Sequence, residues 1–500
     1  MKFLDLLRGR RKRSDALALG EEGLLDGGII KQYEMARMVY SNKPPWVKGE
    51  YGGSGMGALV ASEVARLVTV GMKAAVCANE ELGIRDEELG ELDALLKNGI
   101  LAQVRGQAEK GWALGGLVMK PCLRGTEMSA GSDGCAAYAG GCVSVDMYYP
   151  HQYKILKYNG GRIWDIVFYS VLKAGRDCYT LCERHEYDGA ADSLTVSNRV
   201  FKSDTRPVPY RFTNLGEELL YRDGNWPGGV PDSWKRILPQ ITWHGTGGPI
   251  VGYYKPALAN NENVDNEHAA VPLARCAHII KCIDETSALL EWELKAGKAR
   301  LYVDELAFKY RDNVSGKRQV PDEIAEHVVM LQPHGDRQYF EIFSPGIREQ
   351  NYLNALDYYI KQLEGICGLA RGSFSQAESR HGTTATEVMM TRQRSFAMAA
   401  ENQRALAHCI RDVMQGAAVL KNPGLKQDVR VIIDFDDSLI HRGQEQLDAL
   451  MAMHKAGMYS GRRVLMKWFG YDEEEANAIL EEAECETELL KEGLNGTDDN

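Results

Sequence analysis

Apolar positions recur at helical spacing between residues 384 and 421. A Thr-x-x-Glu capping box stands at the start of this pattern, where the Thr384 hydroxyl and the Glu387 carboxylate can each satisfy a free backbone N–H. Asn422-Pro423-Gly424 supplies a stop signal. The pattern predicts a long helix with Thr384 as its N-cap. Five residues form its apolar stripe: Leu406, Ile410, Val413, Ala417 and Leu420.

A shorter amphipathic helix is predicted just before the long one. Ser344-Pro345 puts proline at the first helical position, and Gly368 ends the run. The polar segment RGSFSQAESRHG, residues 371–382, joins the two helices, and its pattern alone indicates an ordinary solvated connection. The apolar face of the shorter helix carries Leu353, Leu356, Ile360 and Leu363.

Before residue 272 the pattern changes from helices to strands. Helices are predicted at residues 27–45, 58–79 and 83–107. From Gly111 to about residue 256, short runs rich in Val, Ile, Tyr and Trp are separated by Gly, Asn and Asp clusters, which is typical of antiparallel strands. The predicted strands include residues 112–118, 143–149, 164–172, 178–185 and 194–201.

The rest of the chain adds a long helix and a small strand unit. Pro272 opens the helix and Gly297 stops it. After it, strands are predicted at residues 299–303 and 339–343, on either side of a polar, charged stretch. The predicted fold class is therefore α+β, with strands inserted between two helices. Further predicted elements are a strand at residues 429–434, short helices at 443–455, 460–469 and 472–484, and an acidic tail.

Composition and charge narrow the class of protein. Of the 500 residues, 44% are hydrophobic and 26% are charged, as in soluble globular proteins, and no apolar run approaches the roughly 20 residues of a membrane helix. The net charge of -11 is local, because residues 472–500 carry twelve acids against Lys491 alone, which leaves residues 1–471 neutral. A basic surface that wraps nucleic acid is therefore not expected.

The N-terminus and the cysteines indicate an intracellular protein. The basic residues between Arg8 and Arg13 follow the apolar residues of the first heptapeptide, which is the reverse of the order in a secretory signal peptide. Eleven cysteines are scattered through the chain, and reduced thiols in a cytosol account for them best. Cys178-x3-Cys182-x2-His185 has the spacing of a metal half-site, but no second cluster accompanies it.

No catalytic constellation emerges from the motifs. The glycines from Gly52 to Gly57 lack the preceding strand and the GK[ST] ending of a phosphate loop, so they indicate a flexible turn. Asp434, Asp436 and Asp437 follow an apolar strand and offer oxygen ligands for a divalent metal, as in nucleases. Acid clusters are also common where a strand enters a solvated turn, which is the favoured interpretation.

Several weak motifs, taken in their order and spacing, resemble portal proteins of tailed bacteriophages, and most closely the type found in long-tailed phages of Gram-positive bacteria. The resemblance extends from Trp46 to about residue 484. The Cys/Gly-rich segment from Gly131 to Cys142 has no counterpart in it. The motifs are Glu183-x-His185, Pro256 to Asn261, Ile283-Asp284, Pro345-x-Ile-Arg348, Gly368-Leu369 and Thr384-Ala-Thr-Glu-Val388.

The resemblance implies an architecture built of a wing, a stem, a clip and a crown. Carried over by position, the chain divides into a basic N-terminal arm (1–29), the first part of the wing (30–271), a stem helix (272–297), the clip (298–343), the second stem helix (344–369), the tunnel loop (370–382), a helix and strand returning to the wing (383–439), the crown (440–484) and an acidic tail (485–500).

The resemblance also implies a function without catalysis or cofactor. Portal subunits form a ring, usually a dodecamer, at one capsid vertex, through which double-stranded DNA is packaged and ejected without sequence specificity. The implied partners are the terminase large subunit, head-completion or adaptor proteins, and the major capsid and scaffolding proteins, with no membrane. The implied location is the virion, and the bacterial host cytoplasm during assembly.

Within that architecture the loop after the second stem helix is expected to face DNA. This assignment rests on position and charge, because tunnel-loop sequences vary. Two hypotheses of other classes remain: a metal-dependent nuclease using Asp434, Asp436 and Asp437, and a soluble adaptor that binds through the acidic tail. The residues expected to face DNA are Arg371, Ser373, Ser375, Gln376, Arg380 and His381.

Overall fold

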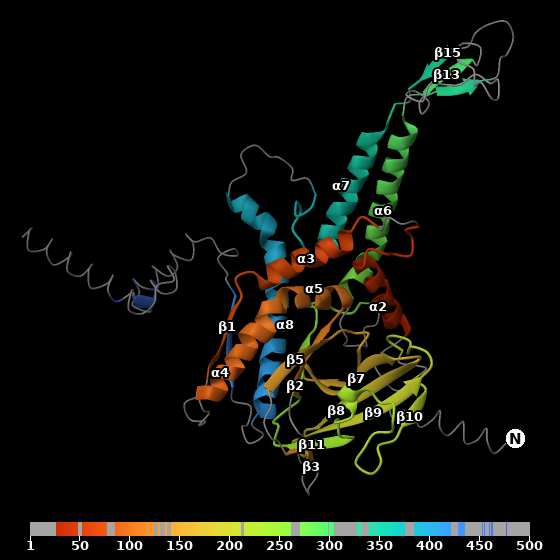
Figure 1. Cartoon of the computed structure of the whole chain (residues 1–500). Coiled ribbons are helices and arrows are strands. Elements are labelled where there is room, and N and C mark those ends of the chain that lie inside the picture. The colour runs from red at the N-terminus through yellow and green to blue at the C-terminus, as the bar shows by residue number, and fades with distance from the viewer. Residues whose placement is uncertain are drawn as a thin grey trace, which may run out of the picture. The chain divides into compact units, whose positions relative to one another are not determined.

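The computed structural model of the chain (Figure 1) divides into two compact units, residues 1–70 with 74–434, and residues 71–73 with 435–500. Apart from Lys73, every element described below belongs to the first unit. The structure describes residues 27–48, 53–77, 86–124, 129–130, 136–137, 142–211, 215–261, 271–298, 300–304, 328–331, 340–344, 346–375, 385–421, 429–435, 453, 455, 460, 462–463 and 477.

A six-stranded antiparallel sheet is the largest β structure of the described chain. Its strands follow the order β10-β9-β8-β7-β6, and β11 pairs with β9 beside β10. The strands predicted at residues 164–172, 178–185 and 194–201 are confirmed as β7, β8 and β9. The bounds are β6 Tyr153–Asn159, β7 Arg162–Ala174, β8 Asp177–Asp188, β9 Ser193–Ser203, β10 Glu217–Leu219 and β11 Gln240–His244.

The side chains of β7 alternate between two apolar clusters on opposite faces of this sheet. Ile166 and Phe168 join one cluster, whereas Val167 and Tyr169 join the other. This period of two is the pattern of a strand covered on both faces. The first cluster also receives Leu420 from the long C-terminal helix, so the sheet and that helix share one core.

A second sheet, of order β12-β2-β5, supports the long helix α8 (Ala385–Lys421). The backbones approach closely there: a Cβ on Gly252 of β12 would lie 2.1 Å from the Cys409 carbonyl of α8, so only glycine fits. The predicted stripe of α8 is confirmed, because all five of its residues are buried. The bounds of the strands are β2 Leu117–Arg124, β5 Cys142–Tyr148 and β12 Gly252–Tyr254.

The N-terminal helices differ in extent from the predictions. Helix α2 spans Gly27–Tyr40, and α3 spans Met56–Thr69 instead of continuing to residue 79. Val70 is extended and Gly71 has a φ of 65°, so the chain leaves the helix there and forms strand β1, Lys73–Cys77. This strand pairs with β16, Arg430–Asp434, which confirms the strand predicted at residues 429–434.

The helix predicted at residues 83–107 is interrupted. Helix α4, Asp86–Ala94, continues as a π-helical turn, Leu95–Ile100, and a 3₁₀ turn, Leu101–Gln103, before α5 runs from Val104 to Leu114. The prediction that a strand begins at Trp112 was therefore wrong. Trp112 is buried on α5, and Gly115, with a φ of 89°, ends the helix before β2.

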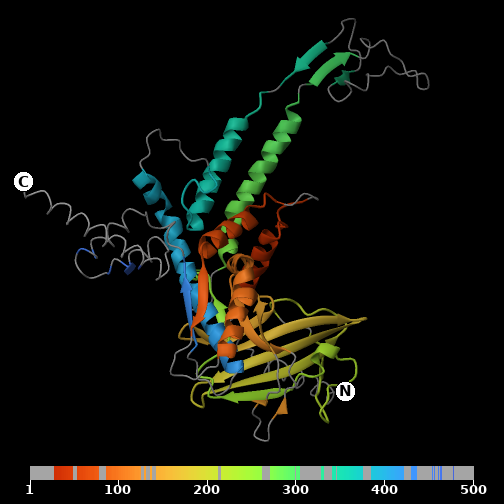
Figure 2. The same ribbon diagram turned by 60° about the vertical axis from the view of Figure 1, so that its left-hand side comes forward.

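Two long helices lie side by side and carry a small sheet between them in sequence (Figures 1 and 2). Helix α6 runs Pro272–Ala296, as the proline and glycine signals predicted. Helix α7 runs Glu349–Ile366 and so begins later than predicted, because the Arg348 backbone N–H and guanidinium bind Glu293 of α6 ahead of its first turn.

The sheet between these helices has the order β14-β13-β15. Strand β13, Arg300–Asp304, pairs antiparallel with β15, Phe340–Phe343, and parallel with β14, Val328–Leu331. The sequence pattern predicted β13 and β15 but not β14.

Among the helices that the structure describes, none has the combined length and apolar character that crossing a membrane requires.

Two further stretches of the chain are described only in part. A two-stranded hairpin, β3 Ser129–Ala130 with β4 Ala136–Ala137, covers part of the Cys/Gly-rich segment. The short helices predicted after residue 443 lie almost entirely outside the described residues. The structure thus supports the α+β class, with mixed helices and mainly antiparallel sheets.

Candidate functional site

Helix α7 ends in a glycine-based closure that turns the chain toward α8. Gly368 has a φ of 74°, which L side chains rarely adopt. The Leu369 N–H donates to the Glu364 carbonyl at 2.8 Å, and the Gly368 N–H donates to the Gly365 carbonyl at 3.4 Å. These are the two hydrogen bonds of a Schellman motif, so the sequence Gly368-Leu369 fixes the direction in which the chain leaves the helix.

The Glu364 carboxylate holds the next residues in place. It is fully buried and accepts hydrogen bonds from the backbone N–H groups of Gly372 at 3.2 Å, Phe374 at 2.6 Å and Ser375 at 2.8 Å. The Ser375 hydroxyl donates a further hydrogen bond at 2.9 Å. A buried charge is costly unless it is compensated in this way, so the carboxylate and the turn stabilise each other.

Helix α8 anchors the same segment from the other side. The Ala370 N–H donates to the Ser395 hydroxyl at 2.7 Å, and the Arg394 guanidinium donates to the Gly365 carbonyl at 2.8 Å. Leu369 and Ala370 are buried. Residues 367–375 are called the loop base below; they are fixed by α7 and α8 before the chain reaches residue 376.

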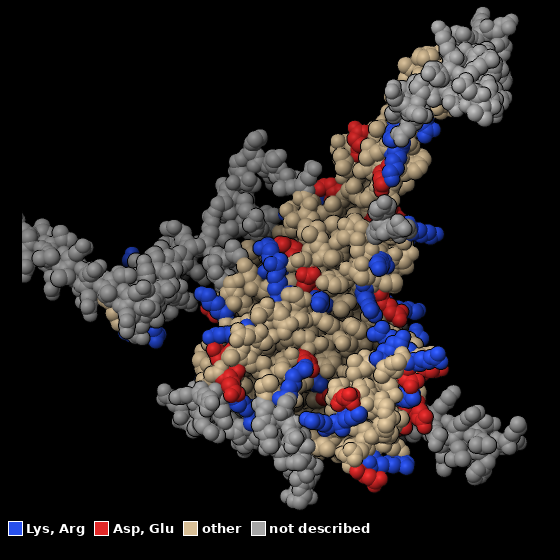
Figure 3. Space-filling model, in the orientation of Figure 1, with Lys and Arg blue, Asp and Glu red and all other residues tan. Residues whose placement is uncertain are grey.

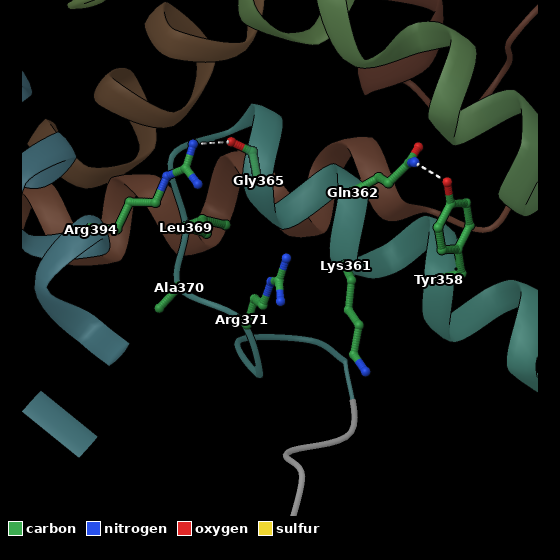
Figure 4. Close-up of a pocket in the computed structure, with 8 residues that line it drawn as sticks. All are labelled: Tyr358, Lys361, Gln362, Gly365, Leu369, Ala370, Arg371 and Arg394. Atoms are coloured by element: carbon green, nitrogen blue, oxygen red, sulfur yellow. Dashed lines mark hydrogen bonds between the residues drawn. The ribbon is translucent and has the colours of Figure 1, made fainter. Parts of the chain in front are cut away.

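A pocket of about 760 Å³ opens beside the loop base. In Figure 4 the Arg371 guanidinium points into it, whereas Arg394 reaches toward Gly365. Lys361 forms an ion pair with Asp357 at 2.9 Å, while Arg371 is exposed and has no ion pair or hydrogen bond to a described residue. The lining residues are Tyr358, Lys361, Gln362, Gly365, Leu369, Ala370, Arg371 and Arg394.

This arrangement offers positive charge without a catalytic set. Three cationic side chains border one pocket, and two of them are engaged by their own protomer. The third, Arg371, can attract an anion by its positive charge and donate two parallel N–H hydrogen bonds to it. No nucleophile with an adjacent base lines the pocket, so its chemistry is that of electrostatic contact.

A comparison with protein families decides the class. The model of the family described as phage portal protein, SPP1 Gp6-like, matches residues 180–489, which is more than half of the chain and includes α6, α7, the loop base and α8. The chain belongs to this family. No curated protein sequence matches the chain.

The main functional hypothesis is thereby confirmed: the chain is a phage portal protein, a component of the virion that acts in virion assembly and genome packaging. Portal proteins in general are structural and non-enzymatic, form homo-oligomeric rings, and interact with capsid proteins and terminase. Neither the family match nor the described residues favour the nuclease or the adaptor hypothesis.

The structure describes three of the six residues predicted to face DNA in this portal protein. Arg371 and Ser373 are exposed, and the Ser373 hydroxyl donates to the Ala370 carbonyl at 2.8 Å. Ser375 is buried and binds Glu364, so within the protomer it supports the loop base. Gln376, Arg380 and His381 lie outside the described residues.

The predicted cap of α8 is described only in part. The first described residue of the helix is Ala385, which follows Thr384 in sequence. Thr384 itself lies outside the described residues, and Glu387 is described only as part of the helical backbone. The capping box therefore stays a prediction.

Glu364 was missed by sequence reasoning, although the sequence holds a signal for it. Ile360, Leu363 and Cys367 lie on the buried side of α7, and a residue four positions after Ile360 shares that side. An acid on such a face must find hydrogen-bond donors nearby. The glycine- and serine-rich turn that follows α7 supplies them.

The candidate metal residues of this portal protein do not come together. Cys182 belongs to the cluster on one face of the large sheet, whereas the His185 ring packs against Phe168 of the cluster on the other face, with ring centroids 5.3 Å apart. Asp434 is exposed at the end of β16, and Asp436 and Asp437 lie outside the described residues. The described chain holds no group of three or more His, Cys, Asp or Glu residues suited to a metal.

His185 instead belongs to a buried ionic group in the large sheet. The Glu183 carboxylate accepts hydrogen bonds from Lys120 at 2.8 and 2.9 Å and contacts His185 Nε2 at 2.6 Å. Burial alone opposes both charges, but the attraction between Lys120 and Glu183 raises the pKa of Lys120 and lowers that of Glu183. Burial lowers the pKa of His185. The ion pair between Lys120 and Glu183 links β2 to β8, so we assign a structural role to this buried group.

Proposed function

We propose that this portal protein forms a ring in which α6 and α7 make the stem around a central channel, and residues 370–382 face the DNA. The observation that carries this proposal is the loop base: a turn fixed by the buried Glu364, with Arg371 left unpaired within the described residues, in a chain that belongs to the portal family. A dodecamer is the expected subunit number, by resemblance to other portals.

An anchored loop base suits a segment that contacts a moving polymer. The turn from which residue 376 departs is held by both α7 and α8, so the attachment of the loop is fixed within the protomer. Few cationic contacts are an advantage here, because many phosphate contacts would make DNA binding tight and strongly dependent on salt. Arg371 is expected to touch the backbone of DNA without gripping it.

The distribution of charge supports the same conclusion. On the face shown in Figure 3, the described Lys and Arg residues are interspersed with Asp and Glu, and no broad patch of one sign covers it. The neutral sum over residues 1–471 agrees with this picture. A channel that conducts DNA of any sequence must let the DNA pass and must not bind it tightly.

Exposed apolar residues on the stem helices supply a contact between neighbouring copies. Trp292 is 64% exposed, Leu289 is 53% exposed and Tyr358 is 57% exposed, although each is large and apolar or aromatic. Leu289 and Trp292 are one turn apart on α6, and contiguous apolar patches are uncommon on monomeric proteins. A heterologous contact that closes by rotation produces a ring, and the family's homo-oligomeric ring provides the occupant, a second copy of this chain.

The small sheet between the stem helices is proposed as the clip, residues 298–343. Phe340 and Ile342 of β15 are 65% and 64% exposed, which leaves apolar surface for neighbouring copies and for docking proteins. The proposed partners at the clip are the terminase large subunit and, later, head-completion or adaptor proteins. The proposed wing (30–271 and 383–439) and crown (440–484) would contact the major capsid and scaffolding proteins.

We further propose that the chain has no catalytic activity of its own. The energy for DNA movement would come from a separate terminase, and the portal would assemble in the host cytoplasm before it occupies one capsid vertex. The basic arm (1–29) and the acidic tail (485–500) are proposed as the two ends of the chain outside the wing and the crown.

Shortening the loop tests the central assignment. Deletion within residues 373–380 would also remove Ser375 and Phe374, which bind Glu364, so the sharper variant removes only residues 376–380. We expect rings of normal size by electron microscopy and at least a tenfold loss of packaged or retained DNA. A tenfold loss corresponds to about 1.4 kcal/mol of lost interaction between the loop and DNA.

Two controls make the loop test decisive. Arg222→Ala, in an exposed turn after β10, should leave both assembly and packaging unchanged. If removal of residues 376–380 prevents ring formation, the loop is an assembly element and the assignment is wrong. If rings form and package DNA normally, the loop does not meet DNA.

A further inference from the structure

Two cysteine thiols meet between the stem helices, where α7 passes into the loop base. The Sγ atoms of Cys276 and Cys367 lie 3.3 Å apart. Cys276 stands near the start of α6, and Cys367 is the residue directly after α7. Both are free thiols, and 91 positions of sequence separate them.

The pair is enclosed by protein. Cys276 is 1% exposed and Cys367 is 5% exposed. The neighbours of Cys367 in sequence hold it firmly, since its N–H donates to the Leu363 carbonyl at 3.0 Å and Gly368 begins the closure of α7. The approach of the two sulfur atoms is therefore built into the packing of α6 against α7.

We propose that Cys276 and Cys367 form a reversible disulfide when the protein passes from a reducing to an oxidising environment, and that this bond fixes the loop base to α6. A disulfide requires the sulfur atoms to approach from 3.3 Å to about 2.05 Å. The proposal concerns a modification site inside one protomer and uses no partner residue.

The reaction is a thiol–disulfide exchange with a low-molecular-weight disulfide such as oxidised glutathione. The thiolate of one cysteine attacks the oxidant, forms a mixed disulfide and releases one glutathione thiolate. The second cysteine loses its proton, attacks the mixed disulfide and releases the second glutathione. The two protein thiols are oxidised to one disulfide, and one oxidised glutathione is reduced to two thiols.

Burial makes this exchange slow. The hydrogen bond that the Cys367 thiol shares with Cys276, together with burial, raises the pKa of Cys367, so little thiolate is present in the closed state. Cys142 is exposed and serves as an internal reference for an accessible thiol. The pair is thus expected to stay reduced through assembly in a reducing cytosol and to oxidise gradually in a released particle.

The consequence for function rests on the proposed role of the loop. The closed disulfide would link α6, α7 and the loop base covalently, while the hydrogen bonds of Ser395 and Arg394 already link the base to α8. The oxidised form would hold the constriction in one position after packaging. The reduced form would leave α6 and α7 free to shift against each other.

The test uses the full-length protein and reads the bond directly. Reduced protein is incubated with oxidised glutathione under native conditions, samples are taken over hours, free thiols are blocked with N-ethylmaleimide during denaturation, and peptides are mapped by mass spectrometry without reduction. We expect a linked peptide containing Cys276 and Cys367, which dithiothreitol removes. Cys142 should acquire glutathione earlier than this bond forms.

Matched variants give a second readout. Cys276→Ala should abolish the linked peptide and also the rise in unfolding temperature that oxidation produces in the unchanged protein; Cys409→Ala, at another buried thiol, should retain both. If both cysteines are still alkylated at the last time point, hours after Cys142 is fully modified, or if either pairs with a different cysteine, the proposal is overturned. The mapping does not depend on ring formation or DNA, so its outcome is separate from that of the loop test.

Discussion

The loop base and the outer surface of the stem lie on the same pair of helices, yet they are built in opposite ways. Glu364 and the loop-base residues Leu369 and Ala370 are buried, and the backbone N–H groups of Ala370 and Ser375 have partners within the protomer. On the outer stem surface, defined by Leu289, Trp292, Leu294, Leu353 and Tyr358, the side chains are 47–64% exposed. One region has its polar groups paired within a single chain, whereas the other leaves apolar side chains exposed.

This difference separates two tasks of a ring protein. In the proposed ring, the segment that positions the loop must hold its shape regardless of neighbours, and the loop base is held by charge-assisted hydrogen bonds to Glu364. A surface that joins copies must remain uncovered until assembly, when about 25 cal/mol per Å² of apolar area becomes available. Substitutions in the two regions should therefore affect different measurements.

The largest expected effect is on assembly. Replacing Leu289 and Trp292 with serine removes two apolar side chains that face solvent one turn apart on α6. Each is worth roughly 1.5–3 kcal/mol when buried, so the association constant of one contact should fall by at least about tenfold and rings should be lost. Light scattering and negative-stain electron microscopy measure this directly.

The same double variant should leave the protomer intact. Its free energy of unfolding is expected to stay within about 0.5 kcal/mol of the unchanged protein, as is usual for surface positions. Leu220→Ser, at a 52% exposed leucine after β10, is the control and should retain rings. Normal ring formation by the double variant would remove the stem surface from the subunit contact.

Glu364→Gln should have the opposite profile. The amide keeps the shape of the side chain but turns an N–H₂ group toward backbone donors, so at least one buried N–H loses its partner. The free energy of unfolding should fall by about 2–4 kcal/mol, as for the loss of hydrogen bonds to a buried charged group. Urea unfolding of the purified protein is the measurement.

A matched control for this prediction lies on the same helix. Glu349, at the first turn of α7, is exposed, and Glu349→Gln should change the free energy of unfolding by less than about 0.5 kcal/mol. Equal stability of the two variants would show that the Glu364 carboxylate does not hold the loop base. Any residual Glu364→Gln protein should still associate through its stem surface.

The link between the stem helices predicts a dependence on pH. Hydrogen bonds from the Arg348 side chain, from Tyr352 and from the Arg348 backbone lower the pKa of Glu293 to about 2 from its ordinary 4.5. Because folding lowers the pKa of Glu293, its ionised carboxylate stabilises the folded state. This stability is fully present above pH 4.5 and is lost as the pH falls toward 2. The outer ends of α6 and α7 should therefore loosen in acid.

Comparison with a variant isolates this carboxylate from the others that titrate in acid. Glu293→Gln should show a shallower fall of stability than the unchanged protein between pH 4.5 and 2, measured by urea unfolding at each pH. Glu291→Gln is the control, because Glu291 is exposed and bonds only Lys295 within its own helix. Parallel pH curves for all three proteins would contradict the prediction.

The parts of the fold that the sequence predicted well are those set by local patterns. The stripe and stop of α8, the proline and glycine limits of α6, and strands β7 to β9 all follow from periodicity and turn residues. Strand β1 was missed because its partner β16 lies far along the chain. A short run such as Lys73–Cys77 carries no local signal that separates it from the end of a helix.

The candidate site was predicted by position and not by contact. Helical spacing located the loop, and Gly368 marked the turn, but the role of Glu364 depends on residues 372–375 folding back on α7. Likewise, the late start of α7 depends on Arg348 reaching Glu293 across the helix pair. Both are tertiary contacts of charged groups, which a single sequence without its fold does not specify.

The smallest expected effect is a hydrogen bond between the loop base and α8. Ser395→Ala leaves the buried Ala370 N–H without its acceptor, which should lower the free energy of unfolding by about 1 kcal/mol. Ser373→Ala is the paired control, because Ser373 is exposed and water can replace its hydrogen bond to the Ala370 carbonyl. If both variants behave alike, α8 does not anchor the loop base and Glu364 alone fixes it; if only Ser395→Ala is weaker, both helices hold the turn from which residue 376 departs.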